Sequence, residues 1–589
     1  MKSLAYLNKF FWKYKLRFFS GILFISASTY FLTASVSFLG KGLDFAKFAA
    51  EHQLNKAQTV HVLMLFGLEI FYYTLAYGFF LFLNRQTIIV MSRLIEYDMK
   101  NEVFEHYQKL DQSFYKTNNT GDLMNRISED VGRVRMYTGP AVMYTTTTII
   151  TLVITIYFMF QENVSYSLFV LAPLPILSFV IYYVSNLINK KSLNVQKQQS
   201  LLATSAQETF SGIRVVKAFS REENIHEQYT KHSNKYLKLN MELSKTDALF
   251  APFMMLLIGV SITLAVYIGG KEAIDGRISV GTITVFVLYV IRLTWPIASL
   301  GWITSLTQRA AASQQRINEF LDIKPNITNP TNEPLQLVGK IEFKNVSFVY
   351  PDSGIMALKN ISFTVEQGKS IAFIGRTGSG KSTIAALLVR LFDASSGEIK
   401  IDNKLINKIN LDDLRNQTGY VPQEVFLFSE TIKGNIGFSV NNLNSIETNH
   451  EVIIQAAKDA AIYSNIMEFP QQFETMVGER GVTLSGGQQQ RISIARAILK
   501  QPQLLIFDDC LSAVDTSTED EILGNLRRIM KAKTTVIISH RVSSVRNADQ
   551  IIVLDNGELV ESGTHNSLLE FNGVYRNLYK KQVEELKNK

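Results

Sequence analysis

The chain has 589 residues, too many for one hydrophobic core, and its length predicts several domains. Hydrophobic residues make up 47% and charged residues 19%, an apolar composition for a soluble protein of this size. The formal net charge is +8, but much of it lies in loops beside apolar runs, and no basic stripe is interleaved with aromatics, so we expect no nucleic-acid partner. The single cysteine, Cys510, excludes an intramolecular disulfide and a metal site built from cysteines.

Apolar runs dominate the first half of the chain, and each is close to the ~20 residues that a helix needs to cross a bilayer. The six predicted spans are residues 18–39, 60–83, 139–160, 165–187, 248–269 and 280–305. The first run is long and lacks a small-residue cleavage site, so we expect it to stay in the membrane. Basic residues ahead of that run place the N-terminus in the cytoplasm, and six spans put the second half on the same side.

The connections between these spans alternate in length. Residues 161–164 form a very short connection without Lys or Arg, whereas residues 84–138 and 188–247 are long, charged and helical in pattern. Two ionisable residues, Glu69 and Arg292, fall inside predicted spans, where such groups normally face a water-filled cavity or a partner. They either line a substrate path or settle helix packing.

Composition changes after the last span. Residues 324–334 are rich in Pro, Asn and Thr, which indicates a linker, and short β-branched strands alternating with helices follow from residue 340. Strands are predicted at residues 341–350, 361–366 and 397–401. The predicted domains are therefore a membrane domain over 1–325, a linker over 326–339, an α/β domain over 340–580 and a charged tail over 581–589.

The most informative local motif is GRTGSGKST, which follows the apolar run at 370–374 and precedes a helical pattern. A strand, a glycine-rich turn and a helix start are the context that a P-loop requires, because backbone N–H groups and the helix dipole converge on phosphates. Lys381 would reach the outer phosphates, and the Ser382 hydroxyl would ligate Mg²⁺. The predicted phosphate-binding residues are Gly375, Arg376, Thr377, Gly378, Ser379, Gly380, Lys381, Ser382 and Thr383.

Two further elements complete this chemistry. The apolar strand LLIFDD ends in Asp508, placed to hold the Mg²⁺ shell, and Asp509, placed as a general base for the attacking water. The string LSGGQ puts two glycines at a helix start and forms an anion-binding nest from Ser485, Gly486, Gly487 and Gln488. Because the domain has its own P-loop, this nest suits a second ATP bound to another copy of the domain.

With these motifs the chain resembles the ATP-binding cassette (ABC) family, whose cassettes dimerise head to tail around two ATPs. The resemblance covers essentially the whole chain, and the spans fused ahead of one cassette are similar to a half-transporter of the ABC exporter type. It implies a multidomain membrane protein in which an all-α transmembrane domain precedes an α/β P-loop NTPase domain. Residues 114–130 and 209–222 match the two intracellular loops of such exporters.

The resemblance also assigns roles to single residues. Tyr350 matches the aromatic residue that stacks on adenine, and Gln423 matches the glutamine that senses Mg²⁺. His540 matches the histidine that hydrogen-bonds the γ-phosphate. Glu479 matches an element that contacts the coupling helices, and Asp515 ends the SAVD loop that crosses to the opposite site.

The chain departs from the family at Asp509, where most members have glutamate. The shorter side chain either is compensated by a neighbouring shift or makes the site slow to hydrolyse. In the family, chains with this substitution often pair with a different half-transporter. We therefore expect a heterodimer in preference to a homodimer, with the intact LSGGQ completing the partner's site.

The sequence thus predicts an ATP-driven exporter subunit of a prokaryotic-type plasma membrane, with its ATP-binding domain in the cytoplasm and ATP and Mg²⁺ as cofactors. The expected partners are a second half-transporter, the lipid bilayer and a small hydrophobic or amphipathic substrate such as a drug, lipid or peptide. The competing interpretations are an ATP-gated channel or regulatory membrane protein, and an importer that uses the exporter fold.

Overall fold

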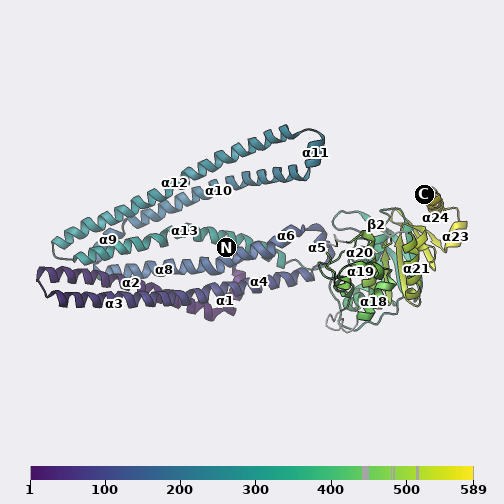
Figure 1. Ribbon diagram of the computed structural model, residues 1–589, viewed down its shortest axis with the longest axis horizontal. Helices are drawn as coiled ribbons and strands as arrows, with labels where there is room; N and C mark the ends of the chain where they lie inside the picture. The colour runs from purple at the N-terminus through teal and green to yellow at the C-terminus, as the bar shows by residue number, and fades with distance from the viewer. Residues whose placement is uncertain (1, 441–449, 479–480, 482–483, 512–515, 588–589) are drawn as a thin grey trace. The chain divides into compact units, whose positions relative to one another are not determined.

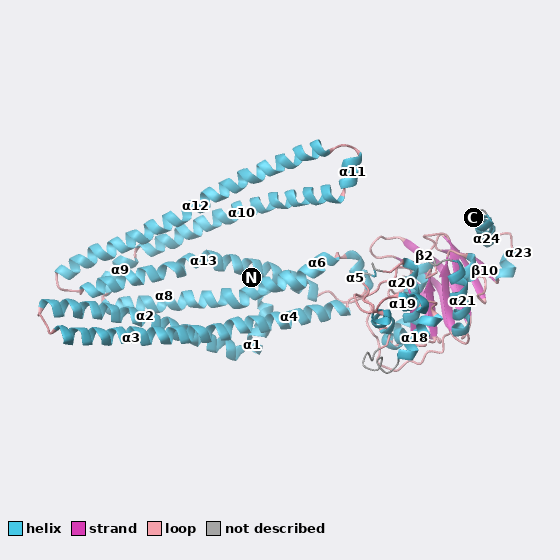
Figure 2. Cartoon of the chain, in the orientation of Figure 1, coloured by secondary structure: helices cyan, strands magenta, loops and turns pink. Residues whose placement is uncertain are grey.

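The computed structural model describes residues 2–587 apart from 441–449, 479–480, 482–483 and 512–515. Contacts within the chain divide it into two compact units (Figure 1). The helical unit comprises Met1–His106 and Gly121–Ile323, and the other unit comprises Tyr107–Thr120 and Lys324–Lys589. All strands lie in the second unit (Figure 2), so the predicted fold class, an all-α part followed by an α/β part, is confirmed.

Long helices build the first unit. They are α2 (Lys15–Glu51), α3 (Lys56–Asn84), α4 (Val90–Lys109), α8 (Val142–Glu162), α9 (Val164–Leu171), α10 (Pro173–Ser211), α12 (Glu222–Ile274) and α13 (Val280–Leu321). Shorter helical segments join them: η1 (Lys2–Leu7), α1 (Asn8–Lys13), η2 (Arg85–Ile89), α6 (Thr120–Asn125), η3 (Arg126–Asp130), α7 (Val131–Met136), η4 (Tyr137–Ala141) and α11 (Ile213–Ala218).

In the described part of the chain, five helical stretches are long and apolar enough to cross a membrane. They are Lys15–Glu51, Lys56–Lys109, Thr120–Glu162, Glu222–Ile274 and Val280–Leu321, and they contain five of the predicted spans. The remaining predicted span, 165–187, covers α9 and the first part of α10. These two helices are separated at Ala172, directly before Pro173, whose ring nitrogen has no hydrogen to donate to the preceding turn.

The predicted helical nature of the long connection 188–247 is confirmed. Helix α10 runs without interruption to Ser211, and α12 begins at Glu222 and continues for 53 residues to Ile274. At 1.5 Å per residue, α12 is about 80 Å long, more than twice the ~30 Å hydrocarbon core of a bilayer. The two helices lie side by side, with the short helix α11 joining their ends (Figure 1).

A close helix contact fixes the start of α13 against α2. The Asp44 carboxylate accepts a hydrogen bond from the Gly281 N–H at 2.7 Å and another from the Ser279 hydroxyl at 2.5 Å. A side chain at position 281 would not fit, because its Cβ would lie 2.2 Å from the carbonyl oxygen of Gly40. Ser279 also caps α13 by accepting from the Thr282 N–H. These contacts set the depth at which the later residues of α13 stand beside α2.

The second unit contains two sheets, whose strand orders are β2-β1-β4-β5 and β10-β9-β3-β8-β7-β6. Their strands are β1 (Ile341–Val349), β2 (Met356–Val365), β3 (Ser370–Gly375), β4 (Ser396–Ile401), β5 (Lys404–Leu405), β6 (Thr418–Val421), β7 (Leu504–Asp508), β8 (Thr534–Ser539), β9 (Gln550–Asp555) and β10 (Glu558–Gly563). The first sheet is antiparallel, whereas β9, β3, β8, β7 and β6 are mutually parallel. Parallel strands put their carboxyl ends at one edge, where ligands of open α/β sheets bind.

Alternating side chains of the central strands pack into two hydrophobic cores. Ile371 and Phe373 of β3 enter one core, and Ala372 and Ile374 enter the other. Both faces of the sheet are therefore buried, as parallel sheets require. The surrounding helical segments are α5 (Gln112–Thr117), α14 (Lys381–Leu388), η5 (Ile406–Lys408), α15 (Leu411–Asn416), α16 (Ile432–Gly437), α18 (His450–Asp459), α19 (Tyr463–Glu468), η6 (Gln472–Glu474), α20 (Gly486–Leu499), α21 (Thr516–Met530), α22 (Val542–Val545), α23 (His565–Glu570) and α24 (Val574–Lys587).

Strands β1 and β4 match their predicted bounds to within one residue, and larger differences occur at two other places in this unit. Strand β2 begins at Met356, five residues before the predicted start at 361. Residues 581–587, predicted as part of a charged tail, continue helix α24.

Candidate nucleotide site

The predicted P-loop lies between strand β3 and helix α14. Gly375 ends β3, and a Cβ at this position would stand 2.1 Å from the Leu554 carbonyl oxygen. Gly380 has a φ of +94°, and a Cβ there would stand 2.3 Å from the Ala357 carbonyl oxygen. Gly375 is required because a side chain would not fit there. Gly380 is required for the same reason and also because its positive φ is unfavourable for other residues. The loop therefore opens directly onto the N-terminus of α14, where backbone N–H groups favour an anion.

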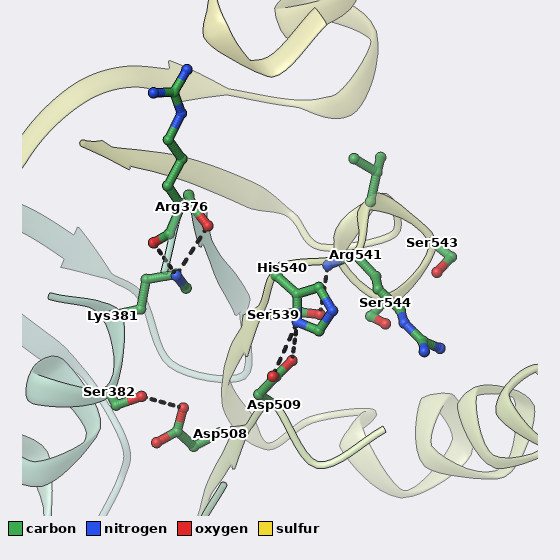
Figure 3. A network of polar contacts seen from close by, with 12 residues as sticks. Arg376, Lys381, Ser382, Asp508, Asp509, Ser539, His540, Arg541, Ser543 and Ser544 are labelled. Carbon is green, nitrogen blue, oxygen red and sulfur yellow. Dashed lines mark hydrogen bonds and ion pairs between the residues drawn. The ribbon is translucent and has the colours of Figure 1, made fainter. Parts of the chain in front are cut away.

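Lys381 folds back onto this loop. Its Nζ donates to the carbonyl oxygens of Gly375 at 3.0 Å and Arg376 at 2.8 Å (Figure 3). Burial lowers the pKa of Lys381, partly offset by the charges of Asp509 and Asp508. A half-buried ammonium group with three donors at the mouth of an anion-binding loop suits phosphate oxygens as acceptors.

Ser382 and Asp508 meet at the carboxyl end of β7. The Ser382 hydroxyl donates to Asp508 Oδ1 at 2.9 Å, and Asp508 is only 2% exposed (Figure 3). Burial, assisted by the neighbouring charge of Asp509, raises the pKa of Asp508 to about 6. A buried carboxylate beside a hydroxyl provides the hard oxygen ligands that Mg²⁺ prefers, so the residues present fit this ion.

Asp509 and His540 face one another from neighbouring strands. His540 Nδ1 lies 2.9 Å from Asp509 Oδ1 and 3.0 Å from Oδ2 (Figure 3). Asp509 has a φ of 48°, an uncommon value for a residue with a side chain, and its N–H donates to the Ile538 carbonyl oxygen at 2.8 Å. The backbone thus ties Asp509 to β8, and both carboxylate oxygens point at the imidazole.

The parallel sheet explains why these residues converge. β3 pairs with β8, and β8 pairs with β7, so the P-loop, His540 and the Asp508–Asp509 pair all follow strands that end at one edge. Lys381, Ser382, Asp508, Asp509 and His540 are therefore brought together from segments far apart in the sequence (Figure 3).

Tyr350 lies directly after β1, and its side chain contacts helix α14. Its hydroxyl is 3.0 Å from Thr383 Oγ1, and its ring packs edge-on against Phe348 and Phe392, with centroids 4.9 and 5.7 Å away. The Lys116 Nζ, from the 107–120 segment of this unit, lies 4.1 Å from the centroid of the Tyr350 ring. Sequence reasoning missed Lys116, because a lone lysine in a short helix carries no signal of a contact more than 200 positions away.

The LSGGQ segment, residues 484–488, forms the start of α20. Ser485 caps this helix by accepting from the Gln488 N–H at 3.3 Å, while the Gln488 side chain accepts from the Ser485 N–H at 2.9 Å. Gly486 and Gly487 are the first residues of the helix. Among the residues that the structure describes, no hydrogen bond joins Ser485–Gln488 to the P-loop.

Of the remaining predicted residues, one makes no hydrogen bond to this cluster and two lie outside the described residues. Gln423 lies in the exposed bend after β6 and, within the described ranges, forms no hydrogen bond with the other site residues. Glu479 and Asp515 lie outside the described residues.

Comparison with known proteins matches both parts of the chain. The family model for the ABC transporter transmembrane region matches residues 18–297, and the model for the ABC transporter cassette matches residues 358–512. A Bacillus subtilis protein described as a probable multidrug resistance ABC transporter ATP-binding/permease protein is 36% identical, over 83% of this chain and 83% of its own. An ATP-dependent lipid A-core flippase of Syntrophus aciditrophicus is 34% identical, over 83% and 80%.

Among solved structures, a bacterial Atm1-family ABC exporter with ATP bound is similar, with a TM-score of 0.78 and 26% identity. The likeness covers 96% of this chain and 98% of that one. The two family models extend over most of the membrane helices and over β3 and β7 of the site. This chain belongs to the ABC transporter family, and it joins a transmembrane region to one ATP-binding cassette.

Proposed function

We propose that the chain is one half of an ATP-driven exporter that moves a hydrophobic or amphipathic molecule across the plasma membrane. The convergence of Lys381, Ser382, Asp508, Asp509 and His540 in a chain with membrane-spanning helices carries this conclusion. The names of the relatives, a multidrug transporter and a lipid A-core flippase, support an amphipathic substrate. We propose residues 1–325 as the membrane domain, 326–339 as the linker and 340–580 as the cassette.

In the proposed site, Tyr350 stacks on adenine, and the loop Gly375–Thr383 holds the phosphates through backbone N–H groups and Lys381. Ser382, Asp508 and Gln423 hold Mg²⁺, which neutralises charge on the phosphates when it is bound. Asp509 orients the attacking water, and His540 contacts the γ-phosphate. Ser485, Gly486, Gly487 and Gln488, with Asp515, act on the ATP of a second cassette. In support, no hydrogen bond joins Ser485–Gln488 to the P-loop of the same chain among the described residues.

We further propose that this chain works with a different half-transporter and that its own ATP site hydrolyses slowly. The geometry at Asp509 supports this proposal. Both Asp509 oxygens lie within 3.0 Å of His540 Nδ1, and in the proposed site a carboxylate engaged in this way would orient an attacking water less well. Lys381, Ser382 and Asp508 retain the groups needed to bind MgATP. The site would then hold ATP while the partner's site turns over.

The function is tested by reconstituting the purified assembly into proteoliposomes and measuring the flux of a fluorescent amphiphile with and without MgATP. We expect flux that requires MgATP and is lost when the Lys381→Ala variant is combined with the equivalent change in the partner. ATP hydrolysis without flux of any amphiphile would favour a regulatory membrane protein, and ion conductance opened by ATP would favour a channel. Mass spectrometry of the assembly purified from its own organism tests the heterodimer, since recovery of this chain alone contradicts it.

A further inference from the structure

A charged side chain lies deep within the membrane helices. Arg292 stands twelve residues after Val280, the first residue of α13, which corresponds to about 18 Å along a helix axis. The hydrocarbon core of a bilayer is ~30 Å thick, so this guanidinium belongs to its interior. Its neighbour on α2 is Thr29, in the middle of the apolar run of that helix.

The guanidinium is poorly satisfied where it stands. One Nη2 hydrogen bond reaches the Thr29 carbonyl oxygen at 3.2 Å, and Nε is buried without a hydrogen-bond partner. The titratable groups that act on Arg292 electrostatically are Tyr77 and Tyr289, and phenols are uncharged at neutral pH. Arg292 therefore has no neutralising charge among the described residues around it.

Asp44 of α2 and Glu69 of α3 lie away from Arg292. Asp44 of α2 is engaged by Ser279 and Gly281 near the start of α13. Glu69 of α3 is exposed, and it precedes Tyr77 by eight residues, or about 12 Å along the helix. Helix packing alone would be served by a neutral side chain. A permanent cation with an unused donor at this depth instead suits an anion that arrives from outside the chain.

Tyr77, which acts electrostatically on Arg292, belongs to an aromatic face of α3. Tyr73, Tyr77 and Phe80 recur at the spacing of one face of α3, and that face packs on α2. The Phe31 ring lies 5.5 Å from the ring of Tyr73 and stacks on Phe80 at 5.6 Å, with an interplanar angle of 5°. This face, which reaches Arg292 through Tyr77, offers an apolar surface to the tail of an amphiphile whose head group binds the guanidinium.

We propose that Arg292 is an anion-binding residue of the substrate path and that the exported amphiphile carries a phosphate-type anionic head group. The head group accepts hydrogen bonds from the guanidinium, including its unused Nε, and the apolar tail lies along Tyr73, Tyr77 and Phe80. This assignment rests on the proposed export function and names the substrate class of that function.

The test measures how three dodecyl compounds that differ only in the head group affect the purified assembly in nanodiscs. Dodecyl phosphate, dodecanol and dodecyltrimethylammonium are titrated against ATPase activity and against tryptophan fluorescence. We expect wild-type protein to bind dodecyl phosphate about tenfold or more tightly than the other two, since a hydrogen bond to a charged group is worth that factor. Equal affinity for the three compounds would overturn the proposal without any variant.

Variants then locate the effect. Arg292→Gln should weaken dodecyl phosphate binding about tenfold and leave dodecanol binding unchanged, whereas Arg292→Lys should stay within about threefold of wild type. Arg277→Gln is the matched control, because this exposed arginine pairs with Glu272 and Asp275 outside the membrane span. An Arg292→Gln protein with a wild-type melting temperature and an undiminished preference for dodecyl phosphate would overturn the assignment.

Further measurements distinguish an amphiphile from free phosphate as the ligand, and the role of Arg292 from the export function. Inorganic phosphate should not compete with dodecyl phosphate, because it lacks the tail; competition at similar concentration would indicate a free-anion site and overturn the amphiphile assignment. ATP-dependent transport of all three compounds at one rate would contradict the role of Arg292 while leaving export intact. No ATP-dependent transport of any amphiphile would overturn the export function itself.

Discussion

Lengthening the side chain of Asp509 by one methylene should accelerate hydrolysis at this chain's own ATP site. The carboxylate is held by three features: His540 Nδ1 at 2.9 and 3.0 Å from its oxygens, the Asp509 N–H bonded to Ile538 at 2.8 Å, and a φ of 48°. The backbone therefore has little freedom to carry the carboxylate forward. Asp509→Glu extends the reach of the side chain by one C–C bond, about 1.5 Å.

The size of the effect follows from the sensitivity of catalysis to distance. A misplacement of about 1 Å costs on the order of 10²-fold in rate, which is about 2.7 kcal/mol in the activation barrier. If distance is the whole deficit, Asp509→Glu should raise the hydrolysis rate at this site by up to about 10²-fold. The affinity for MgATP should not change, because the proposed ligands Lys381, Ser382 and Asp508 are untouched.

The assay is single-turnover hydrolysis of γ-labelled ATP by the purified assembly, combined with steady-state ATPase activity at saturating MgATP. Asp549→Glu is the matched control, since it adds the same methylene to an exposed carboxylate that is bonded to Ser370, at the opposite ends of the strands from the site. A folded Asp509→Glu protein whose single-turnover rate stays within about twofold of wild type would refute the distance argument.

Other predictions concern stability and nucleotide binding. Gly380→Ala should destabilise the cassette by about 1–3 kcal/mol in urea unfolding, because the new Cβ meets the Ala357 carbonyl at 2.3 Å, and Gly378→Ala, with a φ of +84° but open space, should cost less. Equal losses for the two variants would contradict this steric explanation. Arg316→Ala should lower the stability of the helical unit by about 2 kcal/mol. The Asp130 side chain is only 5% exposed, and among its hydrogen-bond partners in the described residues only Ser313 would remain. An unchanged melting temperature would refute this prediction. Lys381→Ala should weaken MgATP binding about tenfold or more by titration calorimetry, whereas Lys369→Ala, an exposed lysine at the start of β3, should bind like wild type.

Much of the site follows from the sequence because the chemistry resides in local motifs at strand ends. The P-loop, the Asp508–Asp509 pair and His540 each follow an apolar strand, and a parallel sheet brings such ends to one edge. The predicted spans similarly follow from apolar length alone, and five of them lie in described helices that are long and apolar enough to cross a membrane.

Features set by distant contacts could not be predicted in the same way. The early start of β2 depends on its pairing with β1, whose register shifts near Asn345 and Asn360, both with positive φ. The placement of Lys116 over Tyr350 depends on the packing of the 107–120 segment in the second unit. The hydrogen bonds between Asp509 and His540 depend on the pairing of β7 with β8. A local sequence pattern does not indicate which strands pair, so these bonds could not be predicted.

Transport into inside-out membrane vesicles tests the central claim most directly, because the cassettes face the added nucleotide. Vesicles containing this chain and its partner half-transporter are given MgATP and a fluorescent amphiphile, and the accumulated dye is measured after rapid filtration. The account predicts ATP-dependent accumulation inside the vesicles that disappears in the Lys381→Ala variant of this chain combined with the equivalent change in the partner. ATP-dependent loss of dye from preloaded vesicles, or accumulation that survives both changes, would contradict it.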